Sequence, residues 1–287
     1  MQHFDPLFDH PFINTLITLA LQEDIGSGDH SSLACVPSDA RGKARLLVKD
    51  NGIICGLPLA QKVFHQVDPT IEVNCMIKDG DAIQYGDIPM TVEGPSRSLL
   101  TAERLILNFM QRLSGVATQT NELVKLIAHT KARLLDTRKT TPGMRILEKY
   151  AVKTGGGQNH RMGLYDMIMI KDNHIDFAGG IAQAIKKTWE YLQTNQLDLK
   201  IEIEARDIDA VKQILDFGSV DFIMLDNFTP SQIKDALQLI GGRYQTEASG
   251  GINANNLVEY AETGVDFISI GAITHQIKSL DLSLKAF

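Results

Sequence analysis

The second half of the sequence repeats short apolar segments separated by stretches of helical periodicity, and this repeat limits the chain to few folds. The six apolar segments are ARLLD (132–136), DMIMIK (166–171), KIEIEA (200–205), DFIMLD (221–226), YQTEAS (244–249) and DFISIG (266–271). Helices are expected between them over 142–152, 181–192, 208–217, 230–240 and 255–263. Alternating strands and helices predict parallel strands, and closing them gives a TIM-like α/β barrel. A doubly wound open sheet is the alternative, but its G-x-G-x-x-G fingerprint is missing from the sequence.

Proline and glycine mark several of the expected helix ends in this half. Pro142 is expected at the first position of its helix, where its missing N–H costs little. Gly218, Gly241 and Gly264 follow three other helical segments and are expected to end them.

The first half of the sequence follows a different pattern. A helix is expected over 13–21, before the Gly-rich stretch EDIGSGDHSS. Short alternating segments between Ala40 and Gly94 predict antiparallel strands.

One more helix is expected after Gly94-Pro95. It should start near Ser98 and stop at Gly115, with one apolar stripe along its length. Arg104 lies off that stripe, so its spacing alone favours a solvent-exposed position.

Length and composition exclude several classes of protein. The 287 residues are 44% hydrophobic, enough to bury a sizeable core in one large domain or two. No run of about 18 apolar residues predicts a membrane span, and the N-terminal MQHFDPLFDHPF lacks the features of a secretory signal. Cys35, Cys55 and Cys75 form no C-x-x-C pair, so reduced cysteines and a cytoplasmic location are expected. A net charge of −7 gives no support to a nucleic-acid partner.

Basic residues concentrate in the stretch 136–174 of this acidic chain. The stretch contains seven Lys and Arg against four Asp and Glu, although the whole chain is negative. These charges are too few and too dispersed for a nucleic-acid face. They indicate a pocket for a small, highly charged anion.

Polar residues or glycines stand at the ends of all six expected strands or directly after them. They are Asp136 to Lys139, Lys171 and Asp172, Glu204, Asp226 and Asn227, Ser249 to Gly251, and Gly271 with Ala272. Barrel enzymes place their chemistry at the carboxyl ends of the strands, so these groups are expected around one barrel mouth. The glycines would let backbone N–H groups approach a phosphate, with a helix N-terminus beyond, although tight turns also use glycine.

The carboxylates of Glu204 and Asp226 are expected at neighbouring strand ends. They could hold Mg²⁺ or receive ribose hydroxyls, and the alternative is that they are buried partners of Lys171 or Arg161. Glu202 points to the same side of its strand as Glu204, which ranks first because it is nearer the strand's end. A phosphorylated sugar with a chelated metal ion, bound beside a second anion, would account for the basic pocket, the two carboxylates and the glycines together.

The motifs together resemble the quinolinate phosphoribosyltransferase family over nearly the whole chain. The segments that carry the resemblance are DTRKTTPGMR, GGGQNHRMGLYD, IKDNH, IEIEA, MLDN, EASGGI and SIGAITH, supported by QEDIGSGDHSS, TAERLILNFMQRLSGVAT and SLDLSLKAF. The resemblance implies a type II phosphoribosyltransferase fold, with an N-terminal α/β sandwich over 1–116 and an incomplete TIM-like α/β barrel over 117–274. Residues 275–287 are expected to pack on the first domain.

The resemblance also implies an activity and a set of site residues. The expected reaction joins quinolinate to phosphoribosyl pyrophosphate with decarboxylation, giving nicotinate mononucleotide, pyrophosphate and CO₂ in de novo NAD biosynthesis, with Mg²⁺ as cofactor. Catalytic roles are implied for Lys139, Lys171, Glu204 and Asp226, and the last two are also the expected metal ligands. The full expected substrate site is Arg104, Thr137, Arg138, Lys139, His160, Arg161, Lys171, Glu204, Asp226, Ser249, Gly250, Gly251, Ile270, Gly271 and Ala272.

Family likeness further implies a homodimer with shared sites, in which Arg104 reaches the neighbouring subunit. Assembly as far as a hexamer of dimers is left open, and neither a nucleic acid nor a membrane is an expected partner. Two alternatives remain for the function. One is a relative of the same fold that acts on another anion, as molybdate-associated paralogues would, and the other is a non-catalytic barrel that senses a metabolite.

Overall fold

The structure is a computed structural model that describes residues 6–287. It contains two compact units. The first comprises the described residues up to Gln119 together with Ile277–Phe287, and the second comprises Thr120–Gln276. The boundary falls within the long helix α4, Ser96–Leu126.

The first unit is built on a four-stranded antiparallel sheet with the order β12-β1-β5-β3. The strands are β1 (Arg41–Val48), β3 (Glu72–Cys75), β5 (Met90–Pro95) and β12 (Leu282–Ala286). Short strands β2 (Gly52–Ile53) and β4 (Ala82–Ile83) pair separately. Along β1 the side chains of Ala44, Leu46 and Val48 are buried in strict alternation, because successive side chains of a strand point to opposite faces. The predicted antiparallel strands are therefore confirmed.

The helices of this unit are only partly those expected. They are η1 (Pro6–Asp9), α1 (Pro11–Ile25), α2 (His30–Cys35), α3 (Leu57–Val67) and the first part of α4. Helix α3 lies inside the stretch predicted as strands alone, and that prediction missed it. Pro58 lies in its first turn, and Leu57, Ala60 and Phe64 are buried at helical spacing.

Helix α4 starts at Ser96 and continues through Gly115, so the predicted stop at Gly115 is wrong. A Cβ at Gly115 would lie 2.4 Å from the carbonyl oxygen of Lys278. The glycine therefore serves a close approach between the helix and the segment that leads into β12. No helix of the described residues, α4 included, is long and apolar enough to cross a membrane.

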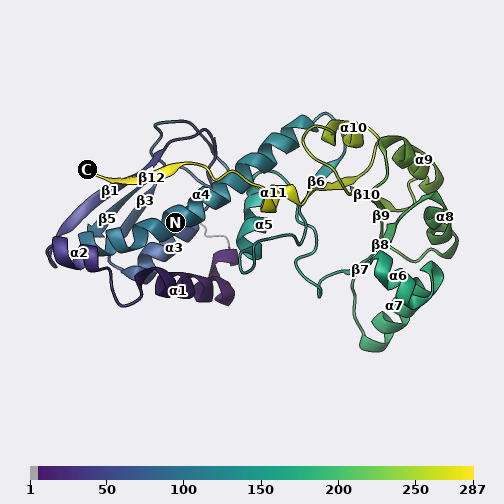
Figure 1. The fold of residues 1–287 in the computed structure, drawn as a ribbon, viewed down its shortest axis with the longest axis horizontal. Helices are drawn as coiled ribbons and strands as arrows, with labels where there is room; N and C mark the ends of the chain where they lie inside the picture. Colours follow the sequence, from purple (N-terminus) through teal and green to yellow (C-terminus); the bar gives the residue numbers. More distant parts are fainter. Residues whose placement is uncertain (1–5) are drawn as a thin grey trace. The chain divides into compact units, whose positions relative to one another are not determined.

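The second unit contains a six-stranded parallel sheet with the order β6-β11-β10-β9-β8-β7. The strands are β6 (Arg133–Leu135), β7 (Ile168–Ile170), β8 (Ile201–Ala205), β9 (Phe222–Asp226), β10 (Gln245–Ser249) and β11 (Phe267–Ser269). Within the described residues β6 and β7 are the two ends of the sheet and do not pair, so the barrel is incomplete. The strands form an arc, with helices along its outer side (Figure 1). This confirms the predicted α/β fold class.

The helices of the second unit are α5 (Arg145–Thr154), α6 (Asp172–Ala178), α7 (Ile181–Asn195), α8 (Ile208–Phe217), α9 (Pro230–Ile240), α10 (Leu257–Ala261) and α11 (Ala272–His275). Gly218 and Gly241 follow α8 and α9 as predicted, but α10 ends at Ala261, before Gly264. Pro142 lies in a turn before α5 rather than at its first position.

The late start of α5 has a visible cause. The side chain of Glu148 accepts a hydrogen bond from the backbone N–H of Thr141 at 3.1 Å. This bond holds the segment before α5 as a loop beyond the end of β6.

Candidate active site

The carboxyl ends of the six parallel strands surround a cavity of about 800 Å³ in the second unit. Every residue of the expected substrate site except Arg104 lines it. Those residues are Thr137, Arg138, Lys139, His160, Arg161, Lys171, Glu204, Asp226, Ser249, Gly250, Gly251, Ile270, Gly271 and Ala272. Arg104 instead lies exposed on α4, in the first unit, as its helical spacing predicted.

Two arginines define the basic part of the cavity. Arg161 donates from Nη1 to the carbonyl oxygen of Met167 at 3.1 Å, which fixes the direction of its guanidinium group. Burial and the positive charge of Arg138 lower the pKa of Arg161. The Nε of Arg138 is buried and has no hydrogen-bond partner within the described residues. An unpaired buried guanidinium N–H beside a second guanidinium indicates a site for an anion.

The loops that carry these arginines are held by a buried ion pair behind the cavity. Lys149 on α5 pairs with Asp136 at the end of β6. Asp136 also accepts hydrogen bonds from Asn159 Nδ2 and from the backbone N–H of His160, both at 2.9 Å. Burial raises the pKa of Asp136 to about 6, against the opposing charge of Lys149, whose own pKa burial lowers.

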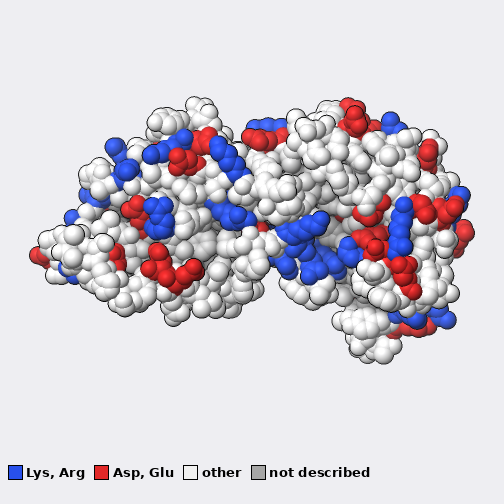
Figure 2. All heavy atoms as spheres, in the orientation of Figure 1, with Lys and Arg blue, Asp and Glu red and all other residues white. Residues whose placement is uncertain are grey.

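Only some of the basic residues in the stretch 136–174 face the cavity. Arg145, Lys149 and Lys153 do not line the cavity, whereas the other four of its lysines and arginines do. Figure 2 shows lysines and arginines gathered on one face of this unit beside a group of acidic side chains.

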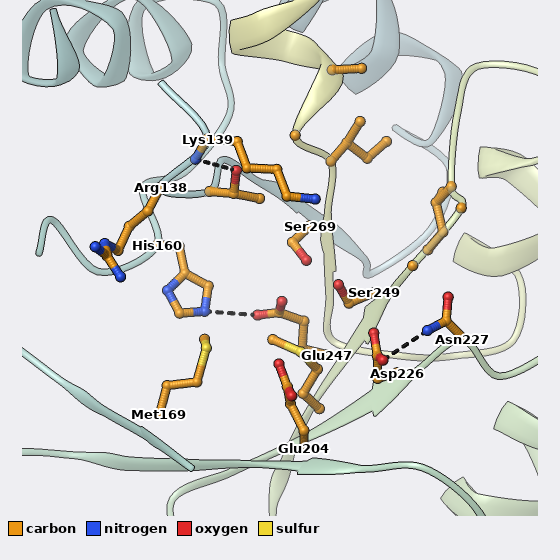
Figure 3. Close-up of a pocket in the computed structure, with 18 of the residues that line it drawn as sticks. Arg138, Lys139, His160, Met169, Glu204, Asp226, Asn227, Glu247, Ser249 and Ser269 are labelled. Atoms are coloured by element: carbon orange, nitrogen blue, oxygen red, sulfur yellow. Dashed lines mark hydrogen bonds and ion pairs between the residues drawn. The ribbon is translucent and has the colours of Figure 1, made fainter. Parts of the chain in front are cut away.

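The acidic part of the cavity contains Glu204 and Asp226. Lys171 forms an ion pair with Glu204, so the alternative expectation of a paired carboxylate is what the structure shows for Glu204. Burial and the charge of Glu204 raise the pKa of Asp226. Asn227 donates from Nδ2 to Asp226 Oδ2 at 2.8 Å (Figure 3).

The donor set fits a hard divalent cation. Mg²⁺ commonly uses one or two carboxylates together with substrate phosphates, and the mutual repulsion of Glu204 and Asp226 would be relieved by a cation between them. The ion pair with Lys171 already neutralises part of the negative charge of Glu204.

Glycines form the corner of the cavity that follows β10 and β11. Gly250 has φ +95° and Gly251 φ +65°, and a Cβ at Gly250 would lie 2.2 Å from Asn227 Oδ1. The side chain of Lys139 passes close to Gly271, with its Cδ 3.0 Å from where a Cβ would be. Exposed backbone at such glycines suits a phosphate. The expected helix N-terminus is present only after Gly271, because α10 begins as late as Leu257.

The floor of the cavity contains residues that the expected site omitted. Glu247 on β10, Met169 on β7 and Ser269 on β11 line it, together with His275 after β11. Glu247 is 2% exposed, and period two along β10 places it on the same side as Ser249. The two-residue spacing between Glu247 and Ser249 could have identified Glu247 from the sequence. Glu202 and Glu204 have the same spacing.

His160 lies over this floor (Figure 3). Its Nε2 is 2.8 Å from Glu202 Oε2 and 3.3 Å from Glu247 Oε2. Burial opposes the charged ring, but hydrogen bonds to the two glutamates outweigh burial and raise the pKa of His160. Within the described residues these three form one set whose spacing would suit a metal ion, and it is distinct from the pair Glu204 and Asp226.

A parallel α/β barrel that joins two guanidinium groups, two carboxylates and two glycine loops around one cavity defines an enzyme-type site for a phosphorylated substrate and a second anion. Two family models match the chain: the quinolinate phosphoribosyl transferase C-terminal domain over residues 116–285 and its N-terminal domain over residues 29–114. The chain belongs to the quinolinate phosphoribosyltransferase family.

Individual relatives agree over nearly the full length. A Nicotiana tabacum protein named quinolinate phosphoribosyltransferase (decarboxylating) 2b, mitochondrial, is 44% identical over 295 residues, covering 98% of this chain and 83% of its own. A probable nicotinate-nucleotide pyrophosphorylase (carboxylating) of Bacillus subtilis is 40% identical over 276 residues, covering 96% and 94%. The crystal structure of NadC from Streptococcus pyogenes superposes with a TM-score of 0.92 at 38% identity, covering 99% and 98%.

Proposed function

We propose that this protein transfers the phosphoribosyl group of phosphoribosyl pyrophosphate to quinolinate with loss of CO₂. The products are nicotinate mononucleotide, pyrophosphate and CO₂, in the de novo synthesis of NAD. The observation that carries this function is the presence, in one cavity, of Arg138 and Arg161 together with the acidic pair and the glycine loops, with the buried Nε of Arg138 lacking a partner within the described residues. The alternatives of another anion or of a metabolite sensor find no specific support in the site.

The basic part of the cavity is the quinolinate subsite. Quinolinate carries two carboxylates on a pyridine ring, and planar guanidinium groups bind carboxylates in a bidentate manner that also fixes the ring's orientation. Arg138 and Arg161 supply these groups, and Lys139 and Lys171 also line the cavity and add positive charge.

The acidic and glycine parts form the phosphoribosyl subsite. Glu204 and Asp226 are suited to the ribose hydroxyls and to Mg²⁺, which would neutralise charge on the pyrophosphate when bound. Backbone N–H groups at Ser249 to Gly251 and at Gly271 are suited to phosphate oxygens.

The chemistry needs no protein nucleophile. The lone pair of the pyridine nitrogen forms a bond to the anomeric carbon as the bond from that carbon to the pyrophosphate oxygen breaks. Positive charge that develops on the ribose is stabilised by the carboxylates of Glu204 and Asp226. The resulting pyridinium then accepts the electron pair of the breaking bond to the 2-carboxylate, CO₂ leaves, and a proton replaces it on the ring carbon.

The test is release of labelled CO₂ from quinolinate labelled in its 2-carboxylate. Release should require phosphoribosyl pyrophosphate and should match nicotinate mononucleotide one to one. Binding of quinolinate without turnover would favour the sensor, and turnover with a different anion alone would favour the paralogue.

We also propose a homodimer with shared sites, since Arg104 is exposed and belongs to the unit that does not contain the cavity. A cytoplasmic location is proposed because Cys35, Cys55 and Cys75 are free thiols.

A further inference from the structure

Both ring nitrogens of His160 contact other parts of the chain. The backbone N–H of Arg161 donates to Nδ1 at 2.6 Å. A nitrogen that accepts a hydrogen bond carries no proton, so the neutral ring holds its proton on Nε2. Nε2 lies between Glu202 and Glu247, and neither ring nitrogen is free to bind a ligand.

The protonation of His160 follows from these contacts. The glutamates favour a second proton on the ring, whereas the Arg161 N–H opposes one at Nδ1. Nε2 carries a proton in either state of the ring, and the Arg161 N–H, which is fixed by the backbone, disfavours a proton at Nδ1. The same contact argues against a metal ion at these three residues, since Nε2 has no lone pair to offer.

The two glutamates reach His160 from separate strands. Glu202 comes from β8 and is fully buried, and Glu247 comes from β10 and is 2% exposed. Strand β9 lies between them in the sheet. Within the described residues, Oε1 of both carboxylates and Oε2 of Glu202 have no hydrogen-bond partner, although Glu202 Oε2 lies 2.8 Å from Nε2 of His160. Buried carboxylates with so few partners are costly, which indicates a role beyond packing.

We propose that Glu202 and Glu247 are positioning residues for the quinolinate subsite. Together they hold the Nε2 proton of His160, so that His160 offers the face of its ring to the pyridine ring and gives no hydrogen bond to a substrate carboxylate. This inference rests on the proposed function for the identity of the ligand. It assigns carboxylate recognition to Arg138 and Arg161 and leaves ring stacking to His160.

Two pairs of substitutions separate this role from a simple structural one. Glu247→Gln keeps an acceptor oxygen at the same place, whereas Glu247→Leu removes it. We expect Glu247→Leu to raise the KM for quinolinate about tenfold or more, because small misplacements at a site are costly. The KM for phosphoribosyl pyrophosphate should stay within about twofold, and Glu247→Gln should recover most of the loss. Equal KM changes for both substrates in both variants would overturn the proposal.

The second pair tests the ring itself. His160→Phe retains a flat face, and His160→Asn retains an N–H without the ring. The proposal expects higher quinolinate affinity in His160→Phe than in His160→Asn. The reverse order would mean that His160 donates a hydrogen bond to the substrate.

A spectroscopic readout keeps the inference separate from the proposed function. The ¹⁵N shifts of labelled histidine report which ring nitrogen carries the proton, whether or not quinolinate is turned over. We expect a proton on Nε2 of His160 in the wild type, and a changed Nε2 shift in Glu202→Leu and Glu247→Leu because the acceptors of that proton are removed. Nδ1 should stay unprotonated in these variants, since the Arg161 N–H still faces it. An Nδ1–H form in the wild type would refute the positioning role, whereas absence of turnover with a correct Nε2–H form would refute only the proposed function.

Discussion

Asn227 adopts a backbone conformation that few residues tolerate. Its φ of +58° is left-handed, its Nδ2 donates to Asp226, and its backbone N–H donates to Ser249 at 2.8 Å. Asparagine accepts this conformation better than most side chains, and here it also fixes the carboxylate next to it. Asn227 therefore has two roles: it allows the left-handed turn after β9, and it orients the carboxylate of Asp226.

Substitution of Asn227 should separate these two contributions. Asn227→Ala should lower stability by about 1 to 2 kcal/mol through the left-handed conformation. It should also lower activity by about tenfold, because the hydrogen bond to a charged carboxylate is lost. Asn227→Gly should restore the stability but not the activity. Chemical denaturation and steady-state rates measure the two effects, and full activity in Asn227→Gly would show that Asp226 needs no such support.

The two arginines of the quinolinate subsite should each be necessary. Arg138→Ala or Arg161→Ala should remove about 3 to 5 kcal/mol of quinolinate affinity, since a desolvated carboxylate would lose its partner. The quinolinate affinity of Arg138→Lys should lie between those of the wild type and Arg138→Ala, because an ammonium group keeps the charge but not the planar guanidinium geometry. Arg133→Ala, an exposed arginine outside the cavity, is the matched control. Unchanged quinolinate KM values in both alanine variants would contradict the subsite.

Glu204 and Asp226 should make turnover dependent on a divalent cation. Exhaustive chelation should abolish activity, and Mg²⁺ or Mn²⁺ should restore it. Asp226→Asn should require about tenfold more Mg²⁺ for half-maximal rate, because one hard ligand is replaced by a weaker one. Asp216→Asn, an exposed substitution on α8, should leave the requirement unchanged. Activity that survives chelation would count against a cation at this pair.

Site residues at the carboxyl ends of strands, or directly after them, could be predicted from sequence, because the parallel direction of the strands brings these ends together. Glu204, Asp226 and the glycines were found in this way. Glu247 could not be found by that rule, since it lies in the middle of β10 and its contact His160 comes from a distant loop. Which cations face the cavity was also undetermined, because Lys149 lies in the same basic stretch but is buried against Asp136.

At the scale of elements, local glycine and proline signals were the least dependable. Gly241 follows α9 in the left-handed conformation that favours glycine. Gly115 carries the same local signal, but its reason lies in a segment more than one hundred residues later along the chain, at Lys278. Helix α3 was missed because the short apolar segments on both sides of residues 57–67 led to the whole stretch being interpreted as strands. A period of two and a period of 3.6 are hard to tell apart over so few residues.

Gly115→Ala tests the contact between α4 and the segment that precedes β12. Helix propensity alone would gain about 1 kcal/mol. We expect a net loss of about 1 to 3 kcal/mol instead, because the new Cβ must displace a backbone carbonyl. Asn108→Ala, at an exposed position of the same helix, should be neutral or slightly stabilising. Thermal unfolding of both variants gives the answer, and a stabilised Gly115→Ala would show that the close approach yields easily.

At the scale of the whole molecule, the fold class followed from one constraint. Parallel strands need crossover connections, and six strands alternating with helices leave few arrangements other than a barrel-like sheet. The repeat does not show whether the barrel closes, and within the described residues β6 and β7 do not pair with each other. Nor does it show whether a site is complete within one chain, and Arg104 bears on that question because it is absent from the cavity lining.

Arg104 is expected to complete the site of a neighbouring subunit, and mixing two inactive variants tests this. Arg104→Ala leaves the barrel intact, whereas Lys171→Ala damages the barrel but still provides Arg104. In a mixed dimer one site carries both defects and the other carries neither, so random exchange should restore about a quarter of the wild-type activity. The matched control mixes Lys171→Ala with Glu204→Gln, which both alter the barrel and should not complement each other. If mass spectrometry demonstrates exchange and no activity returns, the sites are not shared, and Arg104 is an exposed side chain on α4 that contributes little.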